Sequence, residues 1–233
     1  MLRQKILAVA DEPSLLRMLE IGLQSGERDI RTAADGRDAL LIAAEWQPDL
    51  VLVDALTPGV GWDGVCRRLR ETSTAPAILL TARRGQWVVA QALEAGADEC
   101  VAKPFSIADL RALVQTVLGR SQRLPNLGPV SELACDRGKL KIDFARCLAL
   151  RDERVIPLGN TQFRLLAYLA ANPGRVLPYQ EILDEIWGPE QTRGVAALRT
   201  HVALLRQRVE ENPRRPHLIA DVEGLGLQLR ARD

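Results

Sequence analysis

Short apolar runs alternate with stretches of helical periodicity along the first 120 residues. Uninterrupted apolar runs of strand length are typical of strands buried on both faces, which indicates a parallel sheet with helices on both sides. We therefore predict an α/β domain built on a five-stranded, doubly wound parallel sheet. The predicted strands are residues 6–9, 30–33, 50–53, 77–80 and 99–102, and the predicted helices begin at residues 13, 36, 65, 86 and 108.

The pattern changes after a stretch rich in proline and glycine. Residues 119–130 carry two of each with little apolar periodicity, which is typical of a linker. We predict a first domain at 1–120, a linker at 121–130 and a second domain at 131–233. Helices between two sets of short strands make the second domain α+β. Its predicted strands are 140–143, 147–150, 155–158, 217–222 and 226–230, and its predicted helices are 161–171, 179–187 and 194–210.

Charged and hydroxyl side chains follow the predicted strands of the first domain, where a parallel sheet binds its ligands. Asp11 and Glu12 follow the first strand, Asp54 ends the third, Thr81 follows the fourth and Lys103 follows the fifth. Carboxylates gathered at one edge repel each other unless a cation lies between them, and Mg²⁺ prefers oxygen ligands. A carboxylate beside Mg²⁺, an ammonium group and a hydroxyl can accept a phosphoryl group as a nucleophile.

This set of residues resembles the receiver domain of two-component response regulators, which has a flavodoxin-like fold. The second domain resembles the winged helix-turn-helix effector of the OmpR/PhoB-type subfamily. The resemblance implies that Asp54 is the phospho-acceptor and that Thr81 and Lys103 contact the phosphoryl group. It also implies an Mg²⁺ site. The implied metal ligands are Asp11, Asp54 and the backbone carbonyl of Leu56, with Glu12 as a further candidate.

The pocket departs from the family pattern at two positions. Ala10 stands where the family has a second acidic residue, and Cys100 replaces the switch aromatic three residues before Lys103. A reshaped loop after Gly59 leads us to expect Trp62 over the mouth of the pocket. Two interpretations remain open. The chain is either a working receiver with tolerated substitutions or a receiver that no longer uses normal phosphorylation.

The subfamily dimerises through its fourth helix, fifth strand and fifth helix, with salt bridges between the copies. Here the fourth helix carries Val88 and Val89, and the fifth carries Leu113 where an arginine is common. We expect Asp98 to have lost its salt-bridge partners. Our hypothesis is a homodimer with a more apolar face, formed without phosphate. The alternative is that these apolar residues fill the domain core.

The predicted helix at 194–210 has one apolar stripe, and basic residues lie on its other face, as a recognition helix in the major groove of duplex DNA requires. The resemblance supports this interpretation through residues 163–166, 186–188 and 205–208, and it implies that Trp187 begins a loop that contacts RNA polymerase in relatives. The predicted DNA-binding residues are Arg193, Arg199, Thr200, His201, Arg206 and Arg208.

The second domain has a weak electrostatic footprint for a DNA-binding module. From residue 130 onward it holds 16 arginine and lysine residues against 14 aspartate and glutamate residues. Glu223 stands where the wing of the family has an arginine, and Tyr179 stands where an arginine often contacts phosphate. Each lost phosphate contact weakens binding and its salt dependence. We expect DNA binding that is weaker than in typical relatives, or that requires a dimer.

The composition narrows the functional class. Hydrophobic residues make up 47% of the 233 residues and the net charge is +1, so the chain can build sizeable cores and carries no strongly basic tail. No run reaches the roughly 18 apolar residues of a membrane span, and the N-terminus does not resemble a secretory signal. We therefore expect a cytoplasmic protein without a membrane partner. A zinc site is not expected, because the four cysteines form no CxxC pair. They should be reduced, with Cys135 and Cys147 the one pair to test.

These observations predict a transcriptional response regulator rather than an enzyme, with a sensor histidine kinase as its partner. Its receiver would control dimerisation and DNA binding of the winged helix. An alternative is the same architecture acting mainly through protein–protein contacts. A third interpretation makes phosphoryl chemistry in the receiver, including self-dephosphorylation, the principal activity.

Overall fold

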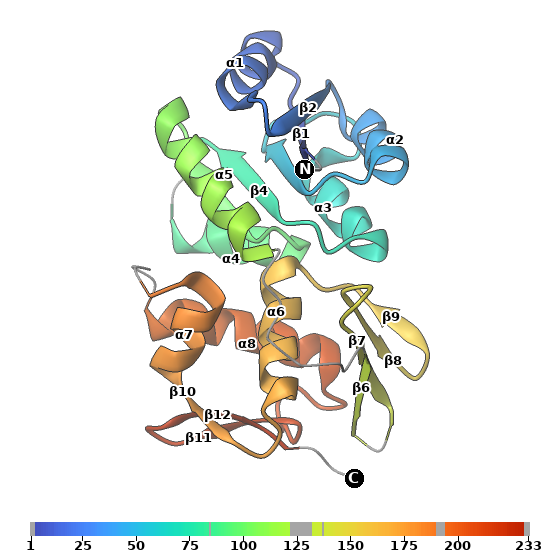
Figure 1. The fold of residues 1–233 in the computed structure, drawn as a ribbon, viewed down its shortest axis with the longest axis vertical. Helices are drawn as coiled ribbons and strands as arrows, with labels where there is room; N and C mark the ends of the chain where they lie inside the picture. Colours follow the sequence, from blue (N-terminus) through green and yellow to red (C-terminus); the bar gives the residue numbers. More distant parts are fainter. Residues whose placement is uncertain (1–2, 84, 122–131, 137, 190–193, 231–233) are drawn as a thin grey trace. The chain divides into compact units, whose positions relative to one another are not determined.

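The computed structural model describes residues 3–83, 85–121, 132–136, 138–189 and 194–230 (Figure 1). The chain divides into two compact units, Met1–Gln122 and Arg123–Asp233. The predicted linker at 121–130 lies outside the described residues except for Ser121. Among the helices that are described, none is long and apolar enough to cross a membrane.

The first unit is the predicted five-stranded parallel sheet with the strand order β2-β1-β3-β4-β5. Helix α3 begins four residues earlier than predicted, because polar and glycine residues at its start hide its periodicity. The elements are β1 (Gln4–Val9), α1 (Pro13–Leu23), β2 (Arg28–Ala33), α2 (Gly36–Trp46), β3 (Leu50–Asp54), α3 (Gly61–Thr72), β4 (Ala77–Thr81), α4 (Gln86–Ala95), β5 (Glu99–Ala102) and α5 (Ile107–Ser121).

Two apolar layers cover the sheet of the first unit. Side chains of α1 and α5 pack on one face, and side chains of α2, α3 and α4 pack on the other. Figure 1 shows α1 and α5 on one side of the strands and α2 and α3 on the other. Because both faces are covered, the central strands β3 and β4 are buried along their whole length. This arrangement confirms the doubly wound fold.

The second unit places three helices between two antiparallel sheets, which confirms the α+β prediction. The hydrophobic pattern did not predict β6 and β10, whose short sequences begin with Glu132 and end with Pro178 respectively and show no uninterrupted apolar run. The elements are β6 (Glu132–Cys135), β7 (Leu140–Asp143), β8 (Leu148–Arg151), β9 (Arg154–Ile156), α6 (Asn160–Ala171), β10 (Val176–Pro178), α7 (Tyr179–Trp187), α8 (Val195–Val209), β11 (Ile219–Val222) and β12 (Gly226–Leu229).

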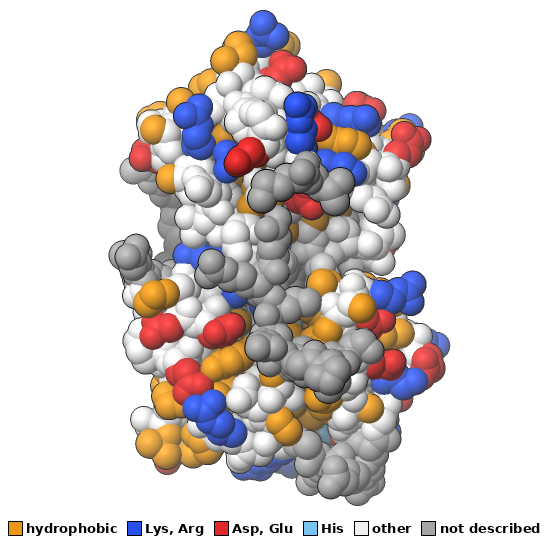
Figure 2. All heavy atoms as spheres, viewed as in Figure 1, with side chains coloured by type: hydrophobic (Ala, Val, Ile, Leu, Met, Phe, Trp, Pro, Cys, Tyr) orange, Lys and Arg blue, Asp and Glu red, His pale blue; other side chains and the backbone are white. Residues whose placement is uncertain are grey.

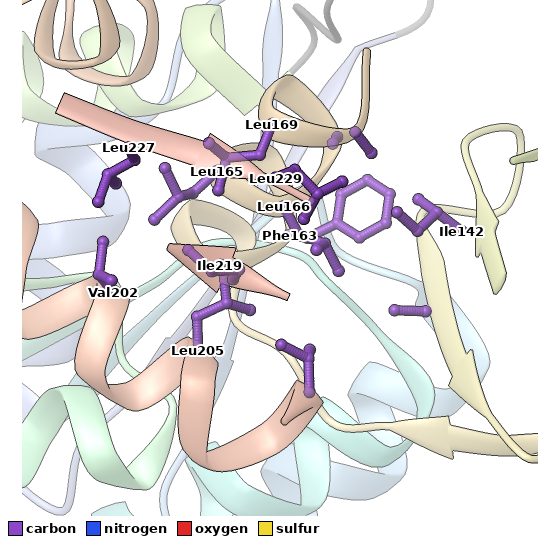
Figure 3. Packing of buried hydrophobic residues seen from close by; sticks show 14 of the residues in the cluster. Ile142, Phe163, Leu165, Leu166, Leu169, Val202, Leu205, Ile219, Leu227 and Leu229 are labelled. Carbon is purple, nitrogen blue, oxygen red and sulfur yellow. The ribbon is translucent and has the colours of Figure 1, made fainter. Parts of the chain in front are cut away.

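One core joins the helices and sheets of the second unit. Phe163 of α6 points its ring toward Ile142 of β7, while Val202 and Leu205 of α8 lie near Ile219 of β11 (Figure 3). All five side chains are almost fully buried. Burying one side chain of this size stabilises a fold by about 1.5–3 kcal/mol, so this core fixes α8 against the β11–β12 hairpin.

The four cysteines are free thiols, so Cys135 and Cys147 form no disulfide. Burial disfavours the charged thiolate and raises the pKa of Cys66 to about 12 and that of Cys135 to about 11. Both thiols are therefore protonated at neutral pH.

Candidate functional site

The pocket of the first unit is formed by residues at the carboxyl ends of adjacent strands. Asp54 is the last residue of β3 and is 2% exposed. The Nζ atom of Lys103 lies 2.8 Å from Asp54 Oδ2 and donates a hydrogen bond to it. Thr81 ends the neighbouring strand β4, is buried, and accepts a hydrogen bond from the backbone N–H of Arg83 at 3.1 Å. The parallel register thus brings together the three residues predicted to handle phosphate.

The first strand contributes a further carboxylate to this edge. Val9 of β1 pairs in register with Val53 of β3, so Asp11 follows the strand beside the one that Asp54 ends. Asp11 is exposed to solvent. Glu12 is the N-cap residue of α1, and its carboxylate accepts a hydrogen bond from the Ser14 hydroxyl rather than from a backbone N–H of the helix.

Sequence reasoning missed Thr57, which is buried in the loop after β3. Its hydroxyl donates to the carbonyl of Asp54 at 2.6 Å and lies 3.5 Å from the carbonyl of Val9. These contacts tie the loop to the ends of β1 and β3. A threonine three residues after a strand end often returns its hydroxyl to the backbone in this way, and that signal was present in the sequence.

The oxygen donors at this edge suit Mg²⁺, although they are few. The predicted ligands Asp11, Asp54 and the carbonyl of Leu56 would supply three protein oxygens, and Mg²⁺ normally keeps several of its waters. Ala10 is fully buried within the core and adds no carboxylate. Accordingly, no group of three or more histidine, cysteine, aspartate or glutamate side chains that could hold a metal occurs within the described ranges.

Two other departures from the family pattern lie against the core rather than in open solvent. Cys100 of β5 is partly buried and packs against the apolar layer under α2, α3 and α4. Trp62, near the start of α3, packs against the same layer. Because Cys100 is far smaller than an aromatic side chain, it fills less of this layer than the aromatic residue that the resemblance implies at its position.

The prediction that Asp98 lost its partners is wrong. Asp98 and Arg70 are both buried, and Asp98 Oδ2 lies 3.0 Å from Arg70 Nη2 and accepts the backbone N–H of Ala77 at 3.0 Å. Arg70 Nε also donates to the carbonyl of Gly96 at 2.8 Å. Gly96 ends α4 with a φ of 100°, a left-handed conformation that favours glycine. Asp98 therefore holds loops together inside the unit and is removed from the dimer face.

The apolar residues of the predicted dimer face separate into two groups. On α4, Trp87 is 64% exposed and Val89 is 43% exposed, with Val88 partly buried between them. Leu113 of α5 is partly buried and packs against the core under α1 and α5. The alternative that these residues fill the domain core therefore holds in part for Leu113. The exposed apolar side chains on α4 do not fill the core. We call Trp87, Val88 and Val89 the α4 patch.

In the second unit, α8 presents part of the predicted DNA-binding set to solvent. Arg199 is exposed, and its guanidinium carbon lies 5.8 Å from the centroid of the Tyr179 ring. The hydroxyl of Thr200 donates to the carbonyl of Ala196 at 3.1 Å. Arg208 is exposed in the last turn, but nine residues place it on the opposite side of the helix from Arg199. Arg193 lies outside the described residues.

The structure corrects the placement of His201. Its ring is 2% exposed, and its centroid lies 5.2 Å from that of the Trp187 ring. Helical spacing puts residue 201 between Leu198 and Leu205 on the buried stripe, so it cannot reach a DNA groove.

Arg206 is also bound within the domain. Its Nη2 and Nε atoms donate to the carbonyl of Ile219 at 2.8 and 3.1 Å, and Nη2 lies 3.2 Å from Asp221 Oδ2. These contacts join α8 to β11. The sequence analysis predicted a DNA-binding role for Arg206, but its guanidinium is engaged within the domain.

The turn between β11 and β12 is acidic and apolar. Glu223 and Leu225 are exposed there, and Asp221 of β11 accepts a hydrogen bond from the Tyr179 hydroxyl at 2.7 Å. This hydrogen bond raises the pKa of Tyr179. On the face drawn in Figure 2, acidic and basic side chains are interspersed over each unit, in keeping with the small net charge.

Comparisons with known proteins match both units. Residues 6–115 match the response regulator receiver domain family, and residues 152–229 match the family described as transcriptional regulatory protein, C terminal. The DNA-binding response regulator MtrA of Mycolicibacterium smegmatis is 36% identical over 225 residues, covering 97% of this chain and 96% of that protein. The DNA-binding dual master transcriptional regulator RpaA of Synechocystis is 33% identical, covering 95% and 93%.

Solved structures agree with this match. The response regulator DrrB of Thermotoga maritima, an OmpR/PhoB homologue, is 28% identical with a TM-score of 0.51, covering 99% of this chain and 100% of that one. A mutant of RitR has a TM-score of 0.82 at 20% identity, covering 98% and 100%, and supports the fold alone. With relatives above 30% identity along nearly its whole length, the chain belongs to the OmpR/PhoB-type transcriptional response regulators, a family of regulators rather than enzymes, in which a receiver precedes a winged-helix domain.

Proposed function

We propose that phosphorylation of Asp54 in a receiver at residues 1–120 controls dimerisation and DNA binding by an effector at 131–233. The contact between Asp54 and Lys103 at the carboxyl edge of the sheet carries this proposal. A carboxylate oxygen of Asp54 attacks the phosphorus of the donor, the bond from phosphorus to the leaving group breaks, and an acyl phosphate forms. Lys103 holds a phosphoryl oxygen, and Thr81 can donate its hydroxyl to another.

Asp11, Asp54 and the Leu56 carbonyl would hold Mg²⁺ in this pocket, with Glu12 as a further candidate. When bound, the ion neutralises negative charge on the phosphoryl oxygens. The proposed phosphodonor is a sensor histidine kinase, and RNA polymerase is a proposed partner of the effector. The cytoplasmic location stays a prediction.

The proposed dimer face comprises α4, β5 and α5, with the α4 patch at its centre. Exposed surface ion pairs contribute about 0–1 kcal/mol each, whereas apolar burial contributes about 25 cal/mol per Å². Burial of the exposed part of Trp87 or of Val89, which helical rotation places on different sides of α4, can therefore replace salt bridges used by relatives. Such a face would give unphosphorylated copies a basal association, which phosphorylation of Asp54 would then strengthen. Leu113 is partly buried in the core of its own copy, so only its exposed part would contribute.

The proposed DNA-binding surface is the outer face of α8. Arg199 and Thr200 lie on this face, whereas Arg208 lies on the opposite side of the last turn and would need a separate phosphate contact. Exposed arginine side chains on a helix can contact phosphates and base edges in the major groove. Glu223 on the wing opposes the same phosphates, so binding is weak for a single effector domain and depends on the dimer.

A phosphodonor assay tests the pocket directly. The full chain is incubated with Mg²⁺ and acetyl phosphate, and phosphorylation is followed by gel migration and intact mass. We expect one phosphoryl group on the wild type and none on Asp54→Ala. Asp63→Asn, which removes a half-exposed carboxylate of α3 that pairs with Arg67, is the matched control and should be phosphorylated normally. A wild type that stays unmodified would show that this receiver no longer uses normal phosphorylation.

The acidic wing favours a second candidate function. Asp221 and Glu223 reduce the positive field where relatives use basic residues, so the effector could act mainly through protein contacts. Binding to duplex DNA of random sequence at low salt separates the two. Salt-dependent binding supports the DNA-binding function, and its absence supports the protein-contact function.

A further inference from the structure

Four side chains from three elements meet on the second unit where the proposed DNA-binding face adjoins the wing. Tyr179 begins α7, Arg199 and Arg206 lie on α8, and Asp221 lies on β11. We call this group the Asp221 cluster. It was not expected from the sequence, because the four residues are far apart in the chain and only the antiparallel hairpin brings Asp221 to α8.

Both carboxylate oxygens of Asp221 are engaged in this cluster. Oδ1 accepts the Tyr179 hydroxyl at 2.7 Å, and Oδ2 lies 3.2 Å from Arg206 Nη2. The Arg206 side chain is only 16% exposed because it also donates to the carbonyl of Ile219. Asp221 thus accepts hydrogen bonds from both the Tyr179 hydroxyl and the Arg206 guanidinium, which face the same surface.

A hydroxyl and a guanidinium are the donors that proteins use to bind DNA phosphates. A carboxylate presents oxygens to them much as a phosphate does. The cluster contains two arginines and one aspartate, so its formal charge is +1 rather than +2. Arg199, beside the Tyr179 ring, keeps its exposed position and is the remaining open cation of the cluster.

We propose that Asp221 sets the DNA affinity of this domain by holding Arg206 and Tyr179 in contacts that a DNA phosphate would otherwise make. The proposal rests on the proposed function of α8 as a DNA-binding surface. Asp221 is an affinity-determining residue in this sense, since it acts through Arg206 and Tyr179 rather than by touching DNA. A phosphate that reaches the cluster must compete with this internal anion, which lowers affinity for every sequence alike.

The first test is Asp221→Asn in the full chain, with a random-sequence duplex as the probe. The amide keeps the size of the side chain and can still accept a hydrogen bond, but it removes the charge. If Arg206 then gains one phosphate contact, the slope of log K against log salt becomes steeper by about 0.9. We expect affinity to rise about threefold to tenfold at low salt, the range of one added charge-assisted contact.

Two further variants distinguish the release of Arg206 and Tyr179 from a general change in the charge of the domain. Glu223→Gln removes the same charge from the same hairpin without touching the cluster contacts, so its effect should be smaller. In the Arg206→Gln background, the gain from Asp221→Asn should largely disappear, because the released donor is missing. A thermal melt of each variant checks that the domain is folded. Partial unfolding would weaken DNA binding and would not make its salt dependence steeper.

The outcomes distinguish this proposal from the proposed function. Wild type that binds DNA while Asp221→Asn leaves affinity and slope unchanged overturns the role of Asp221 and leaves DNA binding intact. Equal gains from Asp221→Asn and Glu223→Gln, or a gain that persists without Arg206, overturn it as well. Binding that appears only in Asp221→Asn supports it. Absence of binding in all variants overturns both proposals.

Discussion

At the scale of single residues, the structure reassigns three charged or polar side chains from surfaces to internal contacts. Asp98 pairs with Arg70, His201 packs beside Trp187, and Arg206 binds β11. In each case the residue type suggested a surface role, whereas the partner lies on another element and is not visible in a local pattern. Burying a charge is costly unless it is paired and hydrogen-bonded, and both Asp98 and Arg206 are paired and hydrogen-bonded in this way.

The Arg70–Asp98 pair gives a prediction about stability. Asp98→Asn leaves the buried guanidinium of Arg70 without its anion, and we expect the free energy of unfolding to fall by about 3 kcal/mol. Urea unfolding of the full chain, followed through the transition of the first unit, measures this loss. The matched control is Asp29→Asn, which removes an exposed partner of Arg3 and should cost less than about 1 kcal/mol. Equal losses for the two variants would contradict the structural role of Asp98.

At the scale of elements, hydrophobic patterns predicted what depends on local periodicity. The helix α7 and the strands β5 and β7 have the predicted bounds, and α4 begins at the predicted residue, because each shows a clear apolar period or run between turn residues. The short strands β6 and β10 were missed, since Glu132 and Pro178 interrupt their apolar pattern and only pairing with β7 and β12 shows them to be strands. The pocket was predictable because parallel strands bring their ends to one edge. The Asp221 cluster depends on tertiary packing and was not.

The α4 patch gives a prediction about association. Val89→Lys places a charge in the proposed apolar interface, and we expect the dimer dissociation constant to rise at least tenfold. This corresponds to about 1.4 kcal/mol, the order expected when an exposed apolar side chain no longer becomes buried. Sedimentation velocity over a range of concentrations, without phosphodonor, measures it. The control is Ile21→Lys on α1, another exposed apolar residue, which should leave association unchanged. A wild type that is monomeric at high concentration would refute the interface.

At the scale of the whole molecule, phosphorylation of the receiver can change DNA affinity only if one state of the chain is favoured both by phosphorylation and by DNA binding. Coupling between two sites is a free energy, and it acts equally in both directions. The proposed dimer would supply such a state, because two effector domains held together would bind two half-sites with a raised effective concentration. Because the chain is nearly neutral, each copy would neutralise few phosphates. The gain in effective concentration from a dimer would therefore be large relative to electrostatic attraction.

This reasoning gives the last prediction, which concerns phosphorylation and DNA binding together. Treatment with acetyl phosphate and Mg²⁺ should tighten binding of the wild type to a two-half-site duplex by about 5–150-fold, the usual range of allosteric coupling. Asp54→Ala should show no tightening, and Val89→Lys should lose most of it while its binding to a single half-site stays the same. Fluorescence anisotropy on both duplexes measures the three proteins. If Val89→Lys kept the full effect, phosphorylation would act within one copy, and the α4 patch would have no part in the signal.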